Sequence, residues 1–519
     1  LLDWLKEVFS YYLQYIILVL GMVESIVAAA CSRIGKNVLH LDSSDHYGGL
    51  WASYNFDGLQ KFMQDIVADP EKQIQVYNIA DKWYIEKGDT VKYEGDMDPA
   101  YKVWTQTLIT HEYRKFNIDM TPKLLFSRGP LVELLISSNI ARYAEFRCVT
   151  RVLTWLEERL VPVPCSRADV FATEAVSIVE KRMLMKMLTS IVAFNEEEMS
   201  NEFKDWNSKT FKEYLTNKGL TPNLIHYVLF AIAGGTDKMP CLEGVRECKK
   251  FLMSLGRYGN TPFLWPMYGS GELPQCFCRL CAVFGGVYCL NRPIDKVESK
   301  TVDEKNVLAI ASKSKTLNCE HLVIGINECP KDLIAPEVVE SCDISKAIFI
   351  TNGSIMKSEK EPLSLLRFPP LVEGGCAVTV LEVGPATGSC PKGLFVVYLI
   401  SDKVTDAESD LKPYAEKIFD MSGIPGDPPG DKPKCLWSLF YNVKDSSSPV
   451  SSSLEAVHIC SGPDAQLDFD RAVDQAEQIF KKICPGAEFL PRAPDPEEIV
   501  FDDDVTHGPD FQGDEDNDK

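Results

Sequence analysis

A single-glycine turn near the start of the chain lies where a dinucleotide phosphate could bind. The turn reads VLGMVE over residues 19–24 and follows an apolar run. A working turn of this kind has the pattern GxGxxG, because glycines let the backbone approach a pyrophosphate at a helix N-terminus. Only Gly21 remains here, and Glu24 would bring a negative charge close to a diphosphate, although Asp42 stands where an acid would hold a ribose. We therefore expect the fold of a dinucleotide-binding unit without a flavin or nicotinamide cofactor.

Three closely spaced cysteines form a second candidate site. Cys276, Cys278 and Cys281 lie in the segment CFCRLC and could ligate a metal. However, no histidine lies nearby, and no second cysteine pair faces them at zinc spacing. Cys278 and Cys281 share a helical face, where a free cysteine packs as a small hydrophobic residue. We therefore favour buried thiols and expect no metal, with a metal site or a reactive surface thiol as the alternatives.

Two other patterns indicate binding surfaces. In SDHYGG, residues 44–49, a tight glycine turn would expose Tyr47. KRMLMKML, residues 181–188, is rich in methionine, which suits adaptable apolar surfaces. This stripe is either part of a core or a contact face for a flexible apolar ligand or partner. The seven histidines are scattered without HExxH, and neither GxSxG nor a P-loop occurs, so we expect no catalytic residues.

The elements around the glycine turn predict a βαβ unit. Residues 15–20 form an apolar run of strand length, residues 25–34 are rich in small residues with helical spacing, and residues 38–42 form a second apolar run that ends on an acid. Strand, glycine turn, small-faced helix and second strand form the opening of a dinucleotide-binding domain.

The rest of the chain predicts a large discontinuous domain with an insertion. Residues 119–235 carry mostly helical spacing and are expected to form the inserted helical domain, between 15–118 and 236–490 of the large domain. Residues 469–483 have the pattern of a closing helix. The strands predicted after the insertion are 307–312, 322–326, 347–351, 376–383, 394–400, 436–443 and 457–460.

Composition and charge limit the class of protein. A chain of 519 residues suggests two or three domains, and a net charge of −21 makes nucleic acid an unlikely partner. The 17 scattered cysteines are typical of reduced thiols in the cytosol. The apolar run 15–23 is too short to span a membrane and has no basic segment before it, so we expect a cytosolic protein. Residues 1–14 form an atypical lead, and the acidic tail 491–519 is expected to be disordered.

Three blocks of sequence resemble the Rab GDP-dissociation inhibitor and Rab escort protein superfamily. They are SDHYGG after a strand, TPFLWPMYGSGELPQ at 261–275 and RLCAVFGGVYCLN at 279–291. The resemblance extends from about residue 15 to about residue 500, which is nearly the whole chain. The cysteine-rich CFCRLCAVFGG, together with ARYAEF and VEKRMLMK, is similar to the escort branch.

The resemblance implies both a fold and a function. The fold is α/β. It has a large FAD/NAD(P)-binding-like domain, related to flavoproteins and built as a three-layer ββα structure, with a smaller all-α domain inserted in it. The implied function is non-catalytic. The protein would bind newly made GDP-bound Rab GTPases, present them to the α/β heterodimer of Rab geranylgeranyltransferase, and deliver the prenylated Rab to membranes in transient contacts.

The resemblance also assigns residues. Tyr47, Glu272, Arg279 and Cys289 match positions of the family's Rab-binding platform. The helical domain would contact the transferase and shelter the geranylgeranyl lipid, and its methionine stripe contributes Met183, Met185 and Met187.

Two alternatives remain at this point. A Rab GDP-dissociation inhibitor would extract and recycle prenylated Rabs without contacting the transferase; the cysteine-rich block and the length of the chain argue against it. An FAD-dependent oxidoreductase would need phosphate contacts that Glu24 and the missing glycines disfavour.

Overall fold

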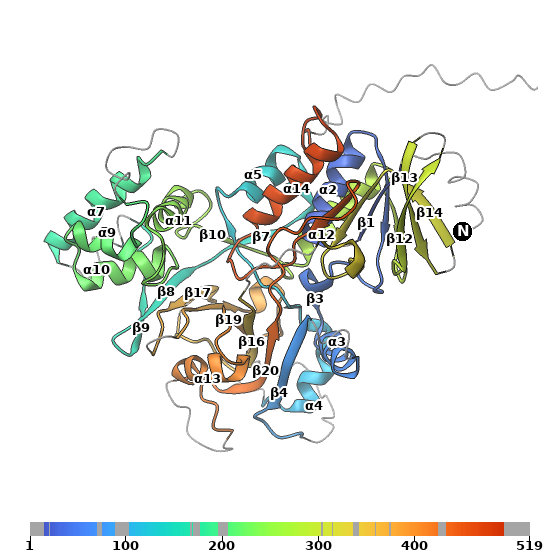
Figure 1. The fold of residues 1–519 in the computed structure, drawn as a ribbon. Coiled ribbons are helices and arrows are strands. Elements are labelled where there is room, and N and C mark those ends of the chain that lie inside the picture. Colours follow the sequence, from blue (N-terminus) through green and yellow to red (C-terminus); the bar gives the residue numbers. More distant parts are fainter. Residues whose placement is uncertain are drawn as a thin grey trace, which may run out of the picture.

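A computed structural model of the chain gives its three-dimensional structure (Figure 1). The structure describes residues 15–19, 21–69, 75–88, 103–166, 169, 177–195, 206–302, 305–313, 315–335, 342–358, 360–372, 375–423 and 432–492. The expected lead 1–14 and almost all of the expected acidic tail, residues 493–519, lie outside these ranges.

The first part of the large domain is a three-layer unit built on a parallel sheet. Its strands lie in the order β11-β2-β1-β15-β21, and every neighbouring pair is parallel. Three helices cover one face, and a three-stranded antiparallel sheet, β12-β13-β14, covers the other (Figure 1). The bounds are β1 Tyr15–Val19, α2 Met22–Arg33, β2 Asn37–Leu41, α12 Glu272–Val283, β11 Val287–Cys289, β12 Lys296–Val302, β13 Lys305–Ser312, β14 Lys315–Cys319, β15 His321–Gly325, β21 Val457–Cys460 and α14 Asp470–Ile483.

The expected βαβ opening is confirmed, and so is the ββα layering. Helix α2 begins after Gly21 and approaches the sheet closely because Ala28, Ala29 and Ala30 are completely buried. Both α12 and α14 pack on α2, so three helices cross above the same part of the sheet. The closing helix predicted at 469–483 is α14.

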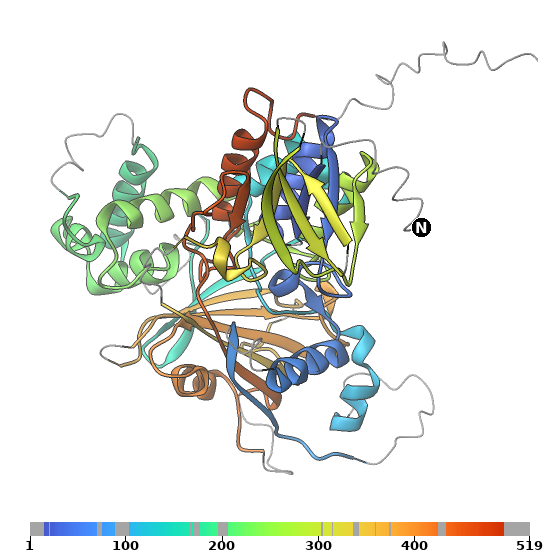
Figure 2. The ribbon, with the colours of Figure 1, turned by 45° about the vertical axis from the view of Figure 1, so that its right-hand side comes forward.

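The second part of the large domain is an eight-stranded sheet in the order β4-β20-β16-β19-β18-β17-β8-β9. Neighbouring strands are antiparallel except β17 and β8. Helix α13 packs on one face, and the sheet lies below the five-stranded sheet in Figure 2. The bounds are β4 Val76–Trp83, β8 Arg151–Leu156, β9 Arg159–Pro162, β16 Ile344–Thr351, β17 Ser364–Phe368, β18 Val378–Val383, β19 Phe395–Asp402, α13 Ala407–Ile418 and β20 Cys435–Val443.

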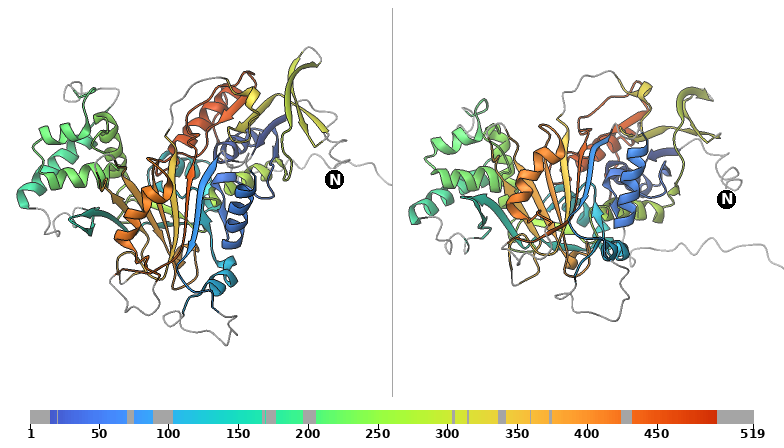
Figure 3. Two further views of the ribbon diagram at one scale, coloured as in Figure 1. Left: turned by 60° about the horizontal axis from the view of Figure 1, so that its bottom comes forward. Right: turned by 90° about the horizontal axis from the view of Figure 1, so that it is seen from below.

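A helical unit lies at the opposite end of the molecule from the three-layer unit (Figure 3). It contacts the eight-stranded sheet through η6, a π-helical turn that packs on β8 and β17. Capping boxes fix the starts of two of its helices, Ser177 with Glu180 at α7 and Thr210 with Glu213 at α9. The bounds are α7 Ile178–Val192, α9 Phe211–Asn217, α10 Pro222–His226, η6 Tyr227–Ile232 and α11 Cys241–Ser254.

The range 119–235, expected to form the inserted helical domain, requires correction. Its first part contains strands β7 (Phe146–Cys148), β8 and β9 besides the short helix α5 (Pro130–Ser137). The segment RVLTWL forms β8 because its first four residues pair with β17, a long-range pairing that local periodicity does not reveal, and its last four pair with β9 in a hairpin. Helix α11, beyond the expected boundary, packs on α7 and α9 and completes the helical unit.

The helices of the protein are short or amphipathic. Within the ranges given above, none combines the length and apolar character needed to cross a bilayer.

Candidate functional site

The four residues assigned to the platform lie on three elements that the fold brings together. Tyr47 follows β2, Glu272 and Arg279 lie on α12, and Cys289 ends β11. Strand β11 is the neighbour of β2, and α12 packs on α2, which connects β1 to β2. We call Tyr47, Glu272, Arg279 and Cys289 the platform residues; their role in binding remains a prediction.

The two charged platform residues lie on one face of α12. Glu272 and Arg279 are two helical turns apart, so both side chains project to the same side. Burial raises the pKa of Glu272, and the Arg279 guanidinium partly offsets that effect. Arg279 is exposed and lies 5.7 Å from the ring centroid of Tyr143, a cation–π contact that orients the guanidinium. The surface therefore offers one cation and one carboxylate in a fixed arrangement.

Asp119 fixes the start of α12. Its carboxylate accepts hydrogen bonds from the Ser270 backbone N–H at 2.8 Å and from the Ser53 hydroxyl at 2.5 Å. The chain turns there at Gly269, whose φ is +104°; a Cβ at this position would lie 2.4 Å from the Asp119 carboxylate. Burial raises the pKa of Asp119 to about 6. The SGE part of the second block is therefore held by an acid 151 residues before Ser270 in the chain.

Tyr47 is supported by a column of rings. Its ring meets Tyr288 edge-on with centroids 5.8 Å apart, and Tyr288 stacks on His40 at 4.3 Å with an interplanar angle of 9°. His40 is completely buried, and neither ring nitrogen has a hydrogen-bond partner among the described residues. Burial lowers its pKa to about 3, so the imidazole is neutral and packs as an aromatic ring. This column holds Tyr47 at the surface, where it is partly exposed.

The three cysteines of α12 are buried. Cys276, Cys278 and Cys281 are at most 6% exposed, and the Cys276 thiol donates to the Tyr143 carbonyl at 3.2 Å. Burial raises the pKa of all three thiols. Across the described parts of the chain, no group of three or more His, Cys, Asp or Glu side chains is arranged to hold a metal ion.

Carboxyl groups occupy the place where this fold would bind a pyrophosphate. Glu24 is 4% exposed, and its carboxylate lies against Gly21 and Gly325, so that a Cβ at either glycine would come within 2.8 Å of it. Burial raises the pKa of Glu24 to about 8 and that of Asp42 to about 6, and Glu328 adds repulsion to both. A flavin dinucleotide does not fit here, because its phosphates would meet carboxyl groups in place of free backbone N–H groups.

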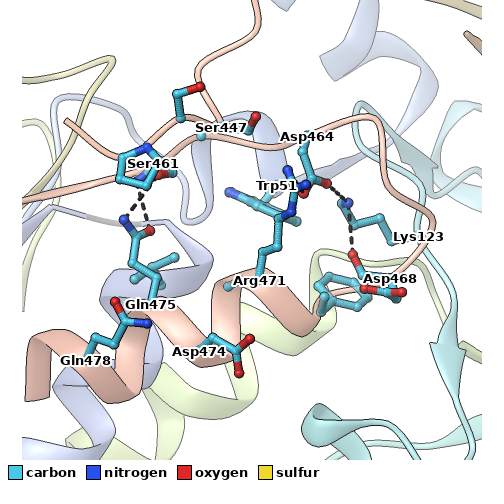
Figure 4. A pocket seen from close by; sticks show the side chains of 16 residues that line it. Trp51, Lys123, Ser447, Ser461, Asp464, Asp468, Arg471, Asp474, Gln475 and Gln478 are labelled. Carbon is cyan, nitrogen blue, oxygen red and sulfur yellow. Dashed lines mark hydrogen bonds and ion pairs between the residues drawn. The ribbon is translucent and has the colours of Figure 1, made fainter. Parts of the chain in front are cut away.

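A cavity of about 450 Å³ lies beside this turn, between Val23 of α2 and helix α14 (Figure 4). Lys123 is almost fully buried there and donates to the Asp464 carboxylate at 2.5 Å and to the Asp468 carbonyl at 2.9 Å. Gln475 accepts from the Ser461 backbone N–H and donates to its hydroxyl, as Figure 4 shows. Lys123 is therefore already neutralised. Arg471, another cation of the lining, lies 3.6 Å from the same Asp464 carboxylate, and Asp468 and Asp474 line the cavity too, so it has no excess of positive charge for a dinucleotide.

Replacing Glu24 with glutamine should make the stability of the protein less dependent on pH. In the folded protein the Glu24 carboxyl keeps its proton until its pKa of about 8, whereas the ordinary value is 4.5. The folded state binds more protons between these values, so this contribution to stability is full below the ordinary pKa and is lost as the pH rises through 8. Thermal unfolding should show a melting temperature that falls by a few degrees more in the wild type than in Glu24→Gln between about pH 5 and about pH 8.5.

The matched control for this experiment is Glu488→Gln. Glu488 is an exposed glutamate of the same unit, so its replacement should leave the pH dependence as in the wild type. Identical pH profiles for wild type and Glu24→Gln would contradict the buried, protonated carboxyl.

The methionine stripe is divided by the fold. Met185 lines an apolar cavity of about 360 Å³ in the helical unit, Met187 is buried in the core at 4% exposure, and Met183 lies beside Gly219. The sequence analysis did not predict most of the residues that line this cavity. The residues that α7 contributes could have been predicted, because they recur at helical spacing around Met185. The lining residues are Val163, Pro164, Cys165, Ser166, Leu184, Met185, Leu188, Thr189, Val192, Tyr227, Ile232, Phe251, Leu252 and Leu255.

A family model and the sequences of known proteins indicate the same family for this chain. Residues 101–490 match the family model described as GDP dissociation inhibitor. The chain is 34% identical to Rab proteins geranylgeranyltransferase component A 2 of Mus musculus, covering 93% of this chain and 97% of that protein. It is 37% identical to Rab proteins geranylgeranyltransferase component A of Drosophila melanogaster, covering 97% and 93%.

Solved structures support the same fold. A Rab GDI from Plasmodium falciparum superposes with a TM-score of 0.63 at 18% identity, covering 91% of this chain and 98% of that chain. An oxidoreductase from Methanosarcina mazei superposes with a TM-score of 0.54 at 11% identity, covering 90% and 100%. Both similarities concern the fold, and the second agrees with the expected likeness to oxidoreductases.

Proposed function

Since this chain belongs to the GDP dissociation inhibitor family, we propose that it is a Rab escort protein: it binds newly made GDP-bound Rab GTPases and presents them to Rab geranylgeranyltransferase. The observation that carries this proposal is the sequence identity of 34–37% to two Rab geranylgeranyltransferase component A proteins. The alignments cover nearly the full length of this chain and of each relative. The three-layer unit would hold the Rab, and the transferase would carry out the prenylation.

The platform residues support a protein-binding role. An exposed guanidinium, a carboxylate and an aromatic ring on one surface are the groups that dominate many protein–protein interfaces. The ring column under Tyr47 and the Asp119 anchor under α12 hold these groups in place before binding. A preformed surface loses less conformational freedom on binding, which favours affinity. This chain would therefore contribute recognition, and no group on it needs to act in catalysis.

The cavity of the helical unit supports a role in sheltering the lipid. Its volume of about 360 Å³ and its lining of Leu, Met, Val and aromatic side chains suit part of a geranylgeranyl chain. Each methylene buried there would stabilise the complex by about 0.8 kcal/mol. We propose that the protein works in the cytosol and contacts membranes transiently when it releases the lipidated Rab.

The test is in vitro prenylation of a GDP-loaded Rab by purified transferase, with and without this protein. Lipid transfer that depends on the protein is the expected result. A second function, that of a Rab GDP-dissociation inhibitor, is favoured by the family match and by the fold of the Plasmodium protein. Tight Rab binding without stimulation of the transferase would support that function, and absence of both would overturn the proposal.

A further inference from the structure

The loop that carries Tyr47 is tied to a buried tyrosine by a chain of hydrogen bonds. The imidazole of His46 lies between two partners, with Nδ1 2.9 Å from the Asp45 carboxylate and Nε2 2.8 Å from the Tyr54 hydroxyl. The same hydroxyl lies 3.4 Å from the Gly49 carbonyl, in the turn that follows Tyr47. The chain of hydrogen bonds therefore meets the loop both before and after Tyr47.

Tyr54 is a firm anchor for this loop. It belongs to the short strand β3 (Ser53–Tyr54) and is only 8% exposed. The preceding residue, Ser53, holds the other half of the platform, because its hydroxyl donates to Asp119 and accepts from the Gly271 N–H at 2.9 Å, just before α12. Strand β3 therefore supports the platform residues from two sides, through the loop and through the start of α12.

The partners of His46 decide where the protons of the chain lie. An ionised carboxylate only accepts hydrogen bonds, so Nδ1 carries a proton that it donates to Asp45. Burial raises the pKa of Tyr54, so its hydroxyl keeps its single proton. With a neutral imidazole, Tyr54 can donate that proton either to Nε2 or to the Gly49 carbonyl, but not to both. If Nε2 is protonated too, it donates to Tyr54, and Tyr54 donates to Gly49. All three hydrogen bonds form together only when His46 is an imidazolium.

The charged groups that face His46 act in the same direction. Asp45 lies beside the ring in the loop, and the hydrogen bond from His46 lowers the pKa of Asp45, so this carboxyl stays ionised. Asp42, at the end of β2, faces the ring from the sheet. An imidazolium attracts ionised carboxylates at both positions, whereas the neutral ring does not, so protonation of His46 draws the loop together.

We propose that His46 is a positioning residue for Tyr47, and that protonation of His46 strengthens the binding of a Rab. The imidazolium completes the chain from Asp45 to Gly49 and holds Tyr47 in one arrangement before the partner arrives, which lowers the conformational cost of binding. The neutral ring leaves one bond of the chain unmade and gives the loop more freedom. This inference rests on the proposed function, because Tyr47 is taken there as a contact of the Rab.

The test is calorimetric titration of the full chain with a GDP-loaded Rab at about pH 6 and at about pH 8, on either side of the ordinary histidine titration. The wild type should bind about 2- to 10-fold more tightly at the lower pH, the effect of one hydrogen bond. His46→Ala should bind more weakly and lose this gain. His46→Gln can still donate to the Tyr54 hydroxyl but has no charge, so it should recover part of the affinity without the gain.

Tyr54→Phe separates positioning from a direct effect of charge. This variant keeps the titrating imidazole of His46 and removes the hydroxyl that links it to Gly49, so it should also lose the gain at the lower pH. The matched control is His111→Gln, at an exposed histidine on α4 (Gln106–His111), outside the three-layer unit. It should keep both the affinity and the pH dependence of the wild type, including any contribution from titration of the Rab itself.

The outcomes that contradict the inference are distinct from failure of the proposed function. A full gain in Tyr54→Phe would mean that the charge of His46 acts on the Rab directly, and a full gain in His46→Gln would assign the pH dependence to another group. Either result, or equal affinities of the wild type at both pH values, would overturn the inference and leave the escort function standing. A wild type that binds the Rab at neither pH would overturn both.

Discussion

Replacing Arg279 with alanine should weaken binding of a GDP-loaded Rab by about 10- to 100-fold, a loss of about 1.4–2.8 kcal/mol. The guanidinium is exposed and held over the Tyr143 ring, so it is ready to meet an acidic group of a partner. Its removal also leaves Glu272 as an isolated carboxylate on the same helix face, which would repel an acidic partner. Prenylation that depends on this protein should decrease in parallel.

Isothermal titration calorimetry with a GDP-loaded Rab gives the affinity directly. The matched control is Arg159→Ala, at an exposed arginine on β9 at the far end of the eight-stranded sheet. Its affinity for Rab should equal that of the wild type. Because Arg279 is at the surface, the melting temperature should not change, which separates lost binding from lost folding. Equal affinities of Arg279→Ala and the wild type would remove α12 from the interface.

The sequence predicted the three-layer unit well because its signals are local. The alanine-rich face of α2, the glycine that precedes it and the apolar strands on either side each require only neighbouring residues to be recognised. The strands predicted after the insertion are confirmed as β13, β15 and β21 of this unit and as β16, β18, β19 and β20 of the eight-stranded sheet.

The boundaries of the helical unit could not be predicted from local sequence signals. Strand β8 lies within the expected helical range, and its partner β17 is more than 200 residues away in the sequence; β9 pairs with β8 and extends the sheet by one strand. Helix α11 lies outside that range, although its contacts with α7 and α9 make it part of the unit. Both errors arise where long-range packing, and not local periodicity, decides the structure.

The candidate site shows the same division. Tyr47, Glu272, Arg279 and Cys289 were assigned by resemblance, and the structure brings their elements together through the pairing of β11 with β2 and the packing of α12 on α2. The residues that support them, Asp119 and His40, were not found, because neither belongs to a recognisable motif. Tyr143 had a signal, since it lies in the segment ARYAEF.

The second prediction tests the lipid cavity of the helical unit. Thr189 lies at its rim on α7 and is exposed, so a tryptophan there can fill the cavity without disturbing the core. If Thr189→Trp prevents burial of about four methylenes, affinity for a geranylgeranylated Rab should fall by about 3 kcal/mol, or roughly 100-fold. Affinity for the same Rab without lipid should not change, because the platform residues lie in the three-layer unit.

The matched control is Lys186→Trp, which adds the same side chain to the same helix. Lys186 is exposed and does not line the cavity, so neither form of the Rab should bind less tightly. Titration with the two Rab forms in the absence of transferase keeps any contact between α7 and the transferase out of the measurement. Equal losses for both forms in Thr189→Trp would indicate a disturbed helical unit, and equal affinities of Thr189→Trp and the wild type for the lipidated Rab would mean that the lipid binds elsewhere. A loss confined to the lipidated form would locate the lipid between α7 and α11, because these helices supply Thr189 and the opposite wall of the cavity.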